Sequence, residues 1–439
     1  MLGGLRRVKR LKKNLVLLSW LGFMVSLGFG SISAVLPYYI LYLAGKLDRL
    51  PETFERISGA SSYALEYTAL MSAFMLTRAI MARYFGTLSD RVGRKKIILV
   101  GTLFYVLMAL AYIASSSTIH LYLIRGFQGI ASAMVWPVAE ALLMDTTDPS
   151  YRGRAMAVYM IANNLAMTSG PAIGAAIYKF GVIVLGIKDV GSALKFPFYG
   201  LALFSSLAIP ATLLLEENSQ RNVSSQTLSN SNIQIKISEE TKRSIKAIYA
   251  MAIGNGVGMG LTAPLYSIFI IEFIKADPAA VATVTTIAGL LGLIVTYPAG
   301  RISDSMGRRP VIISGTFLSR LTTMLIPFSK SLKLFGALSS IRSIAFNFSM
   351  PSFRALQADI VPREVRGKIF GTVQAAFNIG AVIGPLIGGH LYQLYAPKFL
   401  KFWKISIPGA AVPFFISAVI GLITLLVFIK FVKEPRSQR

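Results

Sequence analysis

Several residue types are absent or scarce in this chain of 439 residues. It contains no cysteine, which excludes disulfides and thiolate chemistry, and only two histidines, His120 and His390. Acidic residues are also few, because 19 Asp and Glu stand against 45 Lys and Arg, for a formal net charge of +26. No cluster of His, Asp and Glu and no phosphate-binding loop is visible. We therefore expect neither an enzyme nor a metal site, and no cofactor.

Charged residues make up only 15% of the chain, where a soluble domain carries roughly a quarter. Hydrophobic residues reach 54%, and several apolar runs approach the roughly 20 residues that a helix needs to cross a bilayer. The basic residues lie in short links between these runs, as the positive-inside rule describes, and not in a separate domain. The composition thus predicts an all-α polytopic membrane protein whose surroundings are a lipid bilayer and which has no nucleic-acid partner.

The apolar runs form two sets of six, about twelve membrane segments in all, separated by a polar stretch rich in Ser and Asn. The first set is predicted at 15–43, 64–86, 96–116, 119–145, 154–180 and 196–215. The second set is predicted at 246–271, 279–301, 310–329, 333–358, 367–395 and 406–432. The resulting division is a basic N-terminus at 1–14, a first bundle at 15–215, a linker at 216–245, a second bundle at 246–432 and a tail at 433–439.

Basic residues also predict the orientation of the chain. The opening "RRVKRLKK" at 6–13 leads into a long apolar run and is interpreted as the flank of a first membrane helix. Four links between segments, containing "DRVGRKK", "YRGR", "DSMGRR" and "REVRGK", fall on the same side as this flank and the basic tail. The link "APKFLKFWK" at 396–404 is an exception. We expect a plasma-membrane protein with both termini and the linker in the cytoplasm.

One short motif occurs twice. "GTLSDRVGRKKIIL" at 86–99 returns as "GRISDSMGRRPVII" at 300–313, at an offset of 214 in the numbering. The same offset relates further charged, Gly and Pro positions of the two sets, among them Asp145 and Asp359, and Pro137 and Pro351. The chain is therefore expected to consist of two pseudo-symmetric six-helix copies, an arrangement that suits a protein that rocks around a central site.

These motifs resemble the signature of the major facilitator superfamily of secondary transporters, nearest to its drug and proton antiporter branch. "RGFQGIASA" at 125–133 and "GAVIGPLIGG" at 380–389 resemble two further motifs of that family, although Ala166 and Ala175 replace glycines in the copy around 170. The resemblance implies a monomeric transporter of small molecules that works by alternating access, with protons as the coupling ion.

The resemblance also assigns a gating role to the repeated motif, with Arg94 paired to Asp145 and, by the repeat, Arg308 paired to Asp359. In the family the aspartate matching Asp90 caps helix 11 and its mate, Asp304, faces helix 5. Such contacts hold the two halves together on the cytoplasmic side; the alternative is a solvated basic loop that only fixes topology. The expected gating residues are Gly86, Asp90, Arg91, Gly93, Arg94, Asp145, Arg152, Gly300, Asp304, Gly307, Arg308, Asp359, Arg366, Gly170, Pro171, Gly384 and Pro385.

Ionisable residues inside membrane helices are costly, and each is a functional candidate. Glu140 is the carboxylate placed most clearly inside a predicted segment, and Arg354 lies at the repeat-related position of the other half. We predict that they form a cytoplasmic gate bridge when the site faces outward; the alternative is that Glu140 pairs with Arg152 or Arg154 of its own half. Substrate or coupling roles are predicted for Arg78, Arg125, Gln128, Asn163, Asn164, Asn255, Tyr266, Arg342 and Asn378, with Arg320, Asn347 and Gln374 as further polar residues of the segments.

The sequence leaves several activities open. Export by proton antiport is favoured, and a symporter or uniporter for an organic anion or a sugar is the alternative. The arginines, together with the lack of an acid in the first segment, favour an anionic over a cationic substrate. A non-transporting membrane sensor on the same scaffold is the alternative from another class.

Overall fold

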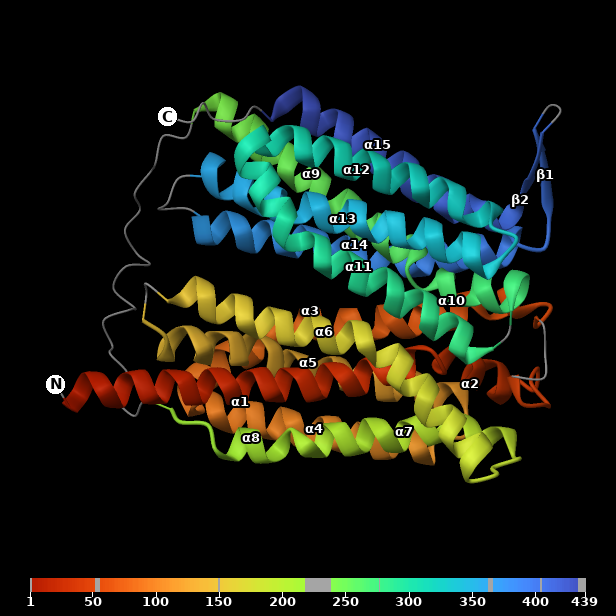
Figure 1. Cartoon of the computed structure of the whole chain (residues 1–439), viewed down its shortest axis with the longest axis horizontal. Coiled ribbons are helices and arrows are strands. Elements are labelled where there is room, and N and C mark those ends of the chain that lie inside the picture. The colour runs from red at the N-terminus through yellow and green to blue at the C-terminus, as the bar shows by residue number, and fades with distance from the viewer. Residues whose placement is uncertain are drawn as a thin grey trace.

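The computed structural model describes residues 2–51, 56–148, 151–217, 238–275, 277–361, 366–402 and 405–432, and within these ranges it does not describe the side chains of 2–11, 366–368, 402 and 405. Two helical bundles lie side by side (Figure 1). The first contains α1 (Leu2–Ser33), α2 (Leu36–Leu43), η2 (Ala60–Tyr63), α3 (Ala64–Val92), α4 (Arg94–Ala114), α5 (Thr118–Thr146), α6 (Arg152–Lys179), η3 (Phe180–Val184), α7 (Val190–Leu207) and α8 (Ile209–Leu213).

The second bundle repeats this order. It contains α9 (Glu239–Thr262), α10 (Leu265–Phe269), η5 (Ile270–Ile274), α11 (Pro278–Met306), α12 (Arg308–Leu325), η6 (Ile326–Phe328), α13 (Leu332–Ile360), α14 (Arg366–Tyr395), β1 (Phe399–Phe402), β2 (Ile405–Pro408), η8 (Gly409–Ala411) and α15 (Val412–Phe431).

Polar residues set where several of these helices begin. The side chains of Ser117, Asp277 and Ser331 accept hydrogen bonds from the backbone N–H groups of His120, Ala279 and Leu334, respectively. Such caps satisfy donors that have no partner within the helix, at a typical gain of about 1 kcal/mol. The long apolar runs between the caps then need no polar partner outside their own helix, as a bilayer demands.

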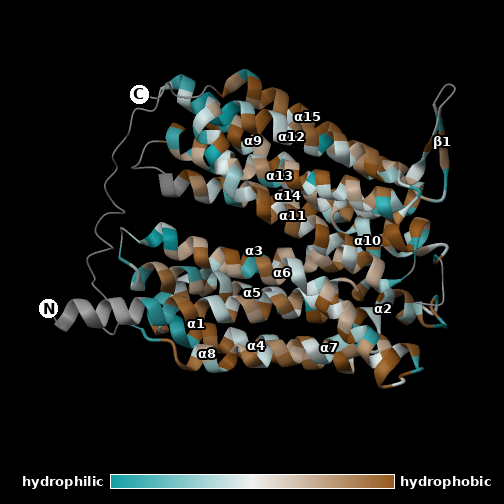
Figure 2. Cartoon of the chain, viewed as in Figure 1, coloured by the Kyte–Doolittle hydropathy of each residue, from teal (hydrophilic) through white to brown (hydrophobic). Residues whose placement is uncertain are grey.

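Ten helical segments of the described residues are long and apolar enough to cross a membrane. α3 and α13 are not apolar enough to be counted among these ten, because α3 carries charges along its length and α13 is rich in Ser and contains two Arg. Both lie among the spans, since α3 packs on α5 and α14, and α13 packs on α11 and α12. Counting these two, the described residues contain the predicted twelve. Figure 2 shows hydrophobic residues along the helices and hydrophilic residues gathered toward the helix ends.

Each half is held together by corresponding helix pairs. α1 packs on α6 in the first bundle, and α9 packs on α14 in the second. The halves meet through α3 with α14 and through α6 with α11. One apolar cluster includes residues of both halves, such as Tyr38 and Leu121 with Phe269 and Phe414. Two further clusters lie within single halves.

The link between α14 and α15 differs from the sequence-based expectation. Residues 399–402 and 405–408 pair as a two-stranded antiparallel hairpin, with Leu400 opposite Ile407. The predicted last membrane segment, 406–432, therefore begins as a strand, and α15 begins at Val412. β-branched and aromatic residues in this stretch favour extended backbone over helix. We call the end of the molecule with this hairpin the hairpin side, and the end where α1 begins and α15 ends the terminal side (Figure 1).

Candidate functional site

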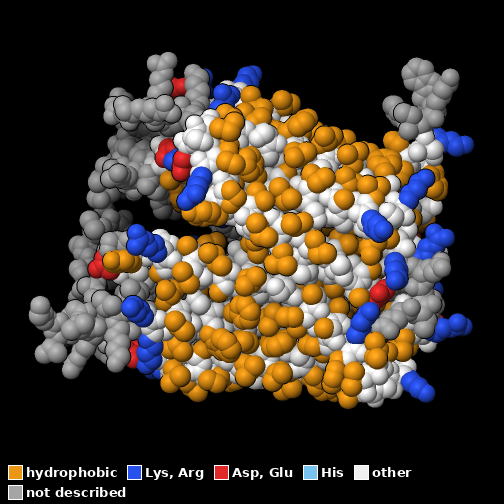
Figure 3. Space-filling model, viewed as in Figure 1, with side chains coloured by type: hydrophobic (Ala, Val, Ile, Leu, Met, Phe, Trp, Pro, Cys, Tyr) orange, Lys and Arg blue, Asp and Glu red, His pale blue; other side chains and the backbone are white. Residues whose placement is uncertain are grey.

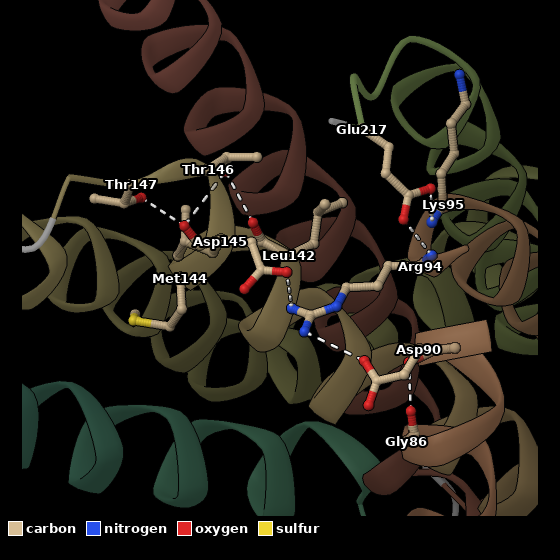
Figure 4. A network of polar contacts seen from close by, with 12 residues as sticks. Gly86, Asp90, Arg94, Lys95, Leu142, Met144, Asp145, Thr146, Thr147 and Glu217 are labelled. Atoms are coloured by element: carbon tan, nitrogen blue, oxygen red, sulfur yellow. Dashed lines mark hydrogen bonds and ion pairs between the residues drawn. The ribbon is translucent and has the colours of Figure 1, made fainter. Parts of the chain in front are cut away.

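The first copy of the repeated motif builds a charged cluster on the terminal side (Figure 4). Gly93 has φ +104°, a conformation that favours glycine, and turns the chain sharply between α3 and α4. This turn brings Arg94 to Asp145 at the end of α5, with N and O atoms 2.8 Å apart, and to Asp90 at 3.5 Å. Glu217, which the sequence analysis did not single out, accepts a hydrogen bond of 2.7 Å from the Arg94 N–H and thus caps α4.

The second copy has the same arrangement. Gly307 has φ +92° between α11 and α12, and Arg308 forms an ion pair with Asp359 at the end of α13. Arg309 donates a hydrogen bond of 2.5 Å to the Ile429 carbonyl of α15. The two ion pairs expected from the repeat are thus present, each within its own half. In this conformation they hold neighbouring helices of one bundle together.

The remaining motif residues lie around these clusters. Arg91 and Asp304 are exposed at the ends of α3 and α11, and Arg152 donates to the Met144 carbonyl at 3.2 Å. The resemblance places an aspartate such as Asp90 at the start of helix 11. The side chains at the start of α14, including Arg366, lie outside the described residues, so this contact stays a prediction.

The two bundles separate on the terminal side. Figure 3 shows a cleft between them at this end. A Cβ atom built on Gly86 of α3, Gly300 of α11 or Gly371 of α14 meets no atom within 4 Å, so these three glycines lie in open space. Contacts between the halves through these motifs therefore stay a prediction.

The hairpin side, in contrast, is closed by contacts between the halves. The Glu272 carboxylate of η5 accepts hydrogen bonds from the Ser61 N–H at 2.6 Å and from the Ser61 hydroxyl at 2.9 Å. Gln393 of α14 donates to the Ser62 carbonyl at 2.8 Å, and the Ile57 N–H donates to the Ile271 carbonyl at 2.9 Å. The sequence gives no sign of this pairing, because the contact joins residues 211 positions apart.

The Gly-Pro motifs allow close helix packing within each half. A Cβ on Gly170 would lie 2.5 Å from the Gly30 Cα of α1, and a Cβ on Gly384 would lie 2.9 Å from the Gly260 Cα of α9. Pro171 and Pro385, which follow these glycines, lie inside α6 and α14. Since no side chain fits between these backbones, the glycines set the distance between α1 and α6 and between α9 and α14.

Glu140 lies on α5 and its side chain is exposed. The two charged groups that act on it are Arg78 of α3 and Arg354 of α13, the latter from the opposite half. No ion pair joins Glu140 to either arginine in the described part of the chain. The bridge between Glu140 and Arg354 is not formed in this conformation and stays a prediction.

Arg125 is almost completely buried, at 1% exposure. It donates to the Gln128 side-chain oxygen at 3.1 Å, one helical turn along α5, and its guanidinium lies 4.9 Å from the Phe29 ring centre. Tyr112 of α4 donates to the same Gln128 oxygen at 3.4 Å. Arg125 is therefore compensated by a neutral amide and an aromatic face, both within its own half.

A second group of arginines occupies the other half. The Arg342 guanidinium lies 5.0 Å from the Tyr266 ring centre, and Arg320, at 8% exposure, donates to the Asn255 oxygen at 2.5 Å. Arg320 interacts electrostatically with both Tyr266 and Arg342. Asn255 and Arg320 also line a small pocket between α9, α12 and α13.

The other predicted polar residues are spread over the two halves. Asn163 of α6 packs against Gly22 of α1, since a Cβ on that glycine would lie 2.1 Å from the Asn163 oxygen. Gln374 donates to Asn378 at 3.0 Å within α14. Asn164 is exposed, and Asn347 donates to the Ser343 carbonyl of its own helix. Among the polar residues named from the sequence, the structure pairs Arg125 with Gln128, Arg320 with Asn255, Arg342 with Tyr266, and Gln374 with Asn378.

The chain matches the model of the Major Facilitator Superfamily over residues 18–245 and 248–439. It is 24% identical over 383 residues to "Multidrug resistance protein 2" of Bacillus subtilis, covering 85% of this chain and 87% of that protein. It is 23% identical over 412 residues to "Quinolone resistance protein NorA" of Staphylococcus aureus, covering 92% and 96%.

Solved structures agree on the fold. A bacterial homologue of the human lysosomal transporter Spinster, in an inward-facing and unoccupied conformation, superposes with a TM-score of 0.69 at 14% identity and covers 97% of this chain and 99% of that one. A structure of the nucleoside transporter NupG superposes with a TM-score of 0.65, also at 14% identity, covering 96% and 100%.

Proposed function

Because the chain belongs to the major facilitator superfamily and is a multi-pass membrane transporter, not an enzyme, we propose that it exports a small organic solute in exchange for protons. The relatives named for multidrug and quinolone resistance support export as the direction. The observation that carries the proposal is the asymmetry of contacts between the halves. They are joined on the hairpin side and separated by a cleft on the terminal side.

The orientation follows from charge. The motif clusters, the basic start of α1 and the end of α15 all lie on the terminal side, so this side faces the cytoplasm and the hairpin side faces outward. The protein then resides in the cell membrane as a monomer with both termini in the cytoplasm. The conformation described here is open to the cytoplasm, ready to take up the solute to be exported.

Alternation needs contacts that are made in one state only. The hydrogen bonds of Glu272 to Ser61 close the outer side here and must break when that side opens. Glu140 and Arg354 interact electrostatically from opposite halves without an ion pair, and closure of the cleft brings them together. Two gates made of different residues can thus close in turn.

Coupling to protons needs carboxylates that change their surroundings between the two states. Glu140 does so on the cytoplasmic side, because the approach of Arg354 favours its charged form. Arg125 has its hydrogen-bond partner, Gln128, within the same half, so its surroundings need not change between the two states, and it supports coupling without carrying the proton. A proton that reaches Glu140 from outside neutralises the carboxylate and breaks its bridge to Arg354, and release of this proton into the open cytoplasmic cleft then drives export.

The test is transport by the purified protein in liposomes with an imposed pH gradient and a pH dye inside, against a panel of organic anions, sugars and cationic dyes. Proton movement that requires a solute and falls in Glu140→Gln supports exchange. Solute flux without proton movement contradicts the proposal and leaves the uniporter. Proton and solute moving in the same direction indicate a symporter.

A further inference from the structure

The link between α14 and α15 does not follow the distribution of basic residues in the rest of the chain. "APKFLKFWK" at 396–404 lies on the hairpin side, opposite to the basic start of the chain and the repeated motifs. It contains three lysines and three aromatic residues, and the longer stretch 391–414 contains no Asp or Glu. The positive-inside rule favours such lysines on the other side of the membrane. Their presence here therefore calls for a partner on the hairpin side.

The hairpin starts at the level where the membrane spans end. The spans on either side of it run over Ile369–Tyr395 and Gly409–Phe431. The Gly409 N–H donates to the Lys398 carbonyl at 2.8 Å, and the Lys398 N–H donates to the Tyr395 carbonyl at 2.9 Å. A Cβ on Gly409 would collide with the Tyr395 carbonyl oxygen, so the chain is closely packed at this point. The two strands are thus fixed to the bundle at the membrane surface.

The strands then turn sideways. Figure 1 shows β1 and β2 running across the direction of the helices and standing clear of the helices at this end of the second bundle. Since the membrane plane also lies across the helices, the hairpin extends along this plane, over the lipid beside the protein. A two-stranded hairpin is at best marginally stable alone in water. The surface on which this hairpin can pack is that of the surrounding leaflet.

The two faces of the hairpin differ in exposure. Leu400 and Ile407 are paired in the register and share a half-buried face. Lys401 is paired with Ser406 on the other face, which also carries Phe399. That face is open, because Lys401 and Ser406 are exposed and the Phe399 side chain is 74% exposed. An exposed aromatic ring beside a lysine with a long apolar stem is typical of residues at a membrane–water interface.

Further lysines lie beside the hairpin. The 3₁₀ turn η6 contacts η8 at the base of the hairpin, and the residues after η6 include the exposed Lys330 and Lys333. Lys398 is also exposed. We call Lys330, Lys333, Lys398 and Lys401 the outer lysines. No ion pair joins any of them to an acid in the described part of the chain.

The partner must therefore supply both negative charge and an apolar layer. Lysines near a membrane surface are attracted to anionic lipids, and each contributes separately to this attraction. An anionic phospholipid offers a phosphate to the outer lysines and acyl chains to Phe399. A soluble anion offers only the first of these, and a neutral lipid only the second.

We propose that the hairpin and the outer lysines bind the phosphate headgroups of anionic phospholipids in the leaflet on the hairpin side. Phe399 inserts among the upper acyl chains, and the lysines contact the phosphates around it. The bound lipids hold the hairpin, and with it the ends of α14 and α15, at the membrane surface. The proposal depends on the membrane location of the chain and not on the solute, direction or coupling of transport.

The experiment measures which lipid lies at the hairpin. The full chain, one molecule per nanodisc, carries a single cysteine in place of Ser406, labelled with the fluorophore bimane. The nanodiscs consist of phosphatidylcholine with a small fraction of a nitroxide-labelled lipid, either phosphatidylglycerol or phosphatidylcholine, with the nitroxide near the top of one acyl chain. Because the nitroxide quenches bimane only at short range, the ratio of the two quenching constants reports the preference of the hairpin for the anionic lipid.

The test variant combines Lys398→Gln with Lys401→Gln. The matched control combines Lys46→Gln with Lys188→Gln, which removes two exposed lysines from loops of the first half on the same side, each within two residues of an aspartate. Test and control variants thus have the same net charge. Phe399→Ser is a second variant that removes the ring and leaves the charge unchanged. Thermal unfolding identifies any variant that fails to fold.

A lysine near an anionic surface contributes about a fivefold preference for it. We therefore expect the parent protein to be quenched about fivefold or more more strongly by phosphatidylglycerol than by phosphatidylcholine. The double lysine variant should lose at least about fivefold of its preference, whereas the control variant keeps it. Phe399→Ser should lower quenching by both lipids, because the hairpin then inserts less deeply.

Several results overturn the proposal. Equal quenching of the parent protein by both lipids shows no recognition of the phosphate charge, and no quenching by either shows that the hairpin does not lie on the membrane. Equal loss of preference in the test and control variants shows that net charge alone acts. A dimer in detergent that becomes monomeric in Phe399→Ser assigns the open face to a second copy of the chain. Failure of proton-coupled transport with the lipid preference intact refutes the proposed exchange and leaves the lipid site standing.

Discussion

The hydrogen bonds that close the hairpin side predict the effect of neutralising the Glu272 carboxylate. Glu272 accepts two hydrogen bonds from Ser61, one of them from the backbone N–H at the start of the helical segment η2 and α3. That position favours an anion because the N–H groups at a helix start are unpaired and carry partial positive charge. Glu272→Gln keeps the shape of the side chain but removes the charge and one acceptor.

The size of the effect follows from comparing the conformation in which the outer side is closed with the one in which it is open. Charge-assisted hydrogen bonds contribute about 1.5–3 kcal/mol, and an amide retains part of this, so we expect the variant to lose about 2 kcal/mol of outer closure. The contact is absent when the outer side is open, so the loss falls on the closed state alone. At about 1.36 kcal/mol per factor of ten, the outward-open population rises by about 30-fold.

Because the chain has no cysteine, a single introduced cysteine can report the outward-open population. A cysteine in place of Thr68, which is fully buried in α3 against Gly389 of α14, reacts with a membrane-impermeant maleimide from outside only when the outer side opens. We expect Glu272→Gln to raise the labelling rate of this cysteine by about 30-fold, since the rate follows the open population.

Glu66→Gln is the matched control. Glu66 lies at the same end of α3, and its Oε2 atom has no hydrogen-bond partner among the described residues. The reasoning is refuted if Glu272→Gln labels at the rate of the parent, or if Glu66→Gln accelerates labelling equally.

Three further predictions concern other parts of the molecule. Glu140→Arg and Arg354→Glu each abolish transport and the double exchange restores part of it; a double variant as inactive as the single ones disproves the gate bridge. Gly170→Ala places a Cβ 2.5 Å from backbone and costs about 1–3 kcal/mol in thermal unfolding, whereas Gly153→Ala, which meets no atom within 4 Å, costs little. The backbone hydrogen bond from Ser192 at the start of α7 lowers the pKa of Asp189. The cap that the charged Asp189 side chain makes on α7 is therefore fully stabilising above the ordinary carboxyl pKa of 3.8, and its contribution is lost as pH falls through the lowered pKa. Asp189→Ala should therefore reduce the melting temperature at pH 7 and make no difference at about pH 2, by differential scanning fluorimetry.

Much of the fold follows from the sequence because a bilayer leaves few alternatives. Long apolar runs must be helices in lipid, and the repeat at offset 214 identifies two related halves. The prediction of an all-α membrane protein with about twelve spans is confirmed. The hairpin at 399–408 was missed because aromatic and β-branched residues suit both a membrane helix and a strand.

The site was predictable where partners are related by the repeat. The pairs Arg94–Asp145 and Arg308–Asp359 are recognisable from equal spacing and opposite charge. The contact of Glu272 with Ser61 is not, because it has no repeated counterpart and depends on how the two halves dock. Arg320 and Asn255 likewise come together only through the packing of α12 on its own bundle, which spacing does not encode.

Alternating access is the central claim, and the distance between the halves on each side tests it most directly. Spin labels on cysteines at Ser62 and Lys398 report the outer side, and labels at Thr87 and Ser305 report the cytoplasmic side, all at exposed positions. Pulsed electron paramagnetic resonance on the protein in nanodiscs measures both pairs over a range of pH, with and without transported solute. The account predicts that the outer distance lengthens whenever the cytoplasmic one shortens. Both distances lengthening together, or neither changing under any condition, would contradict it.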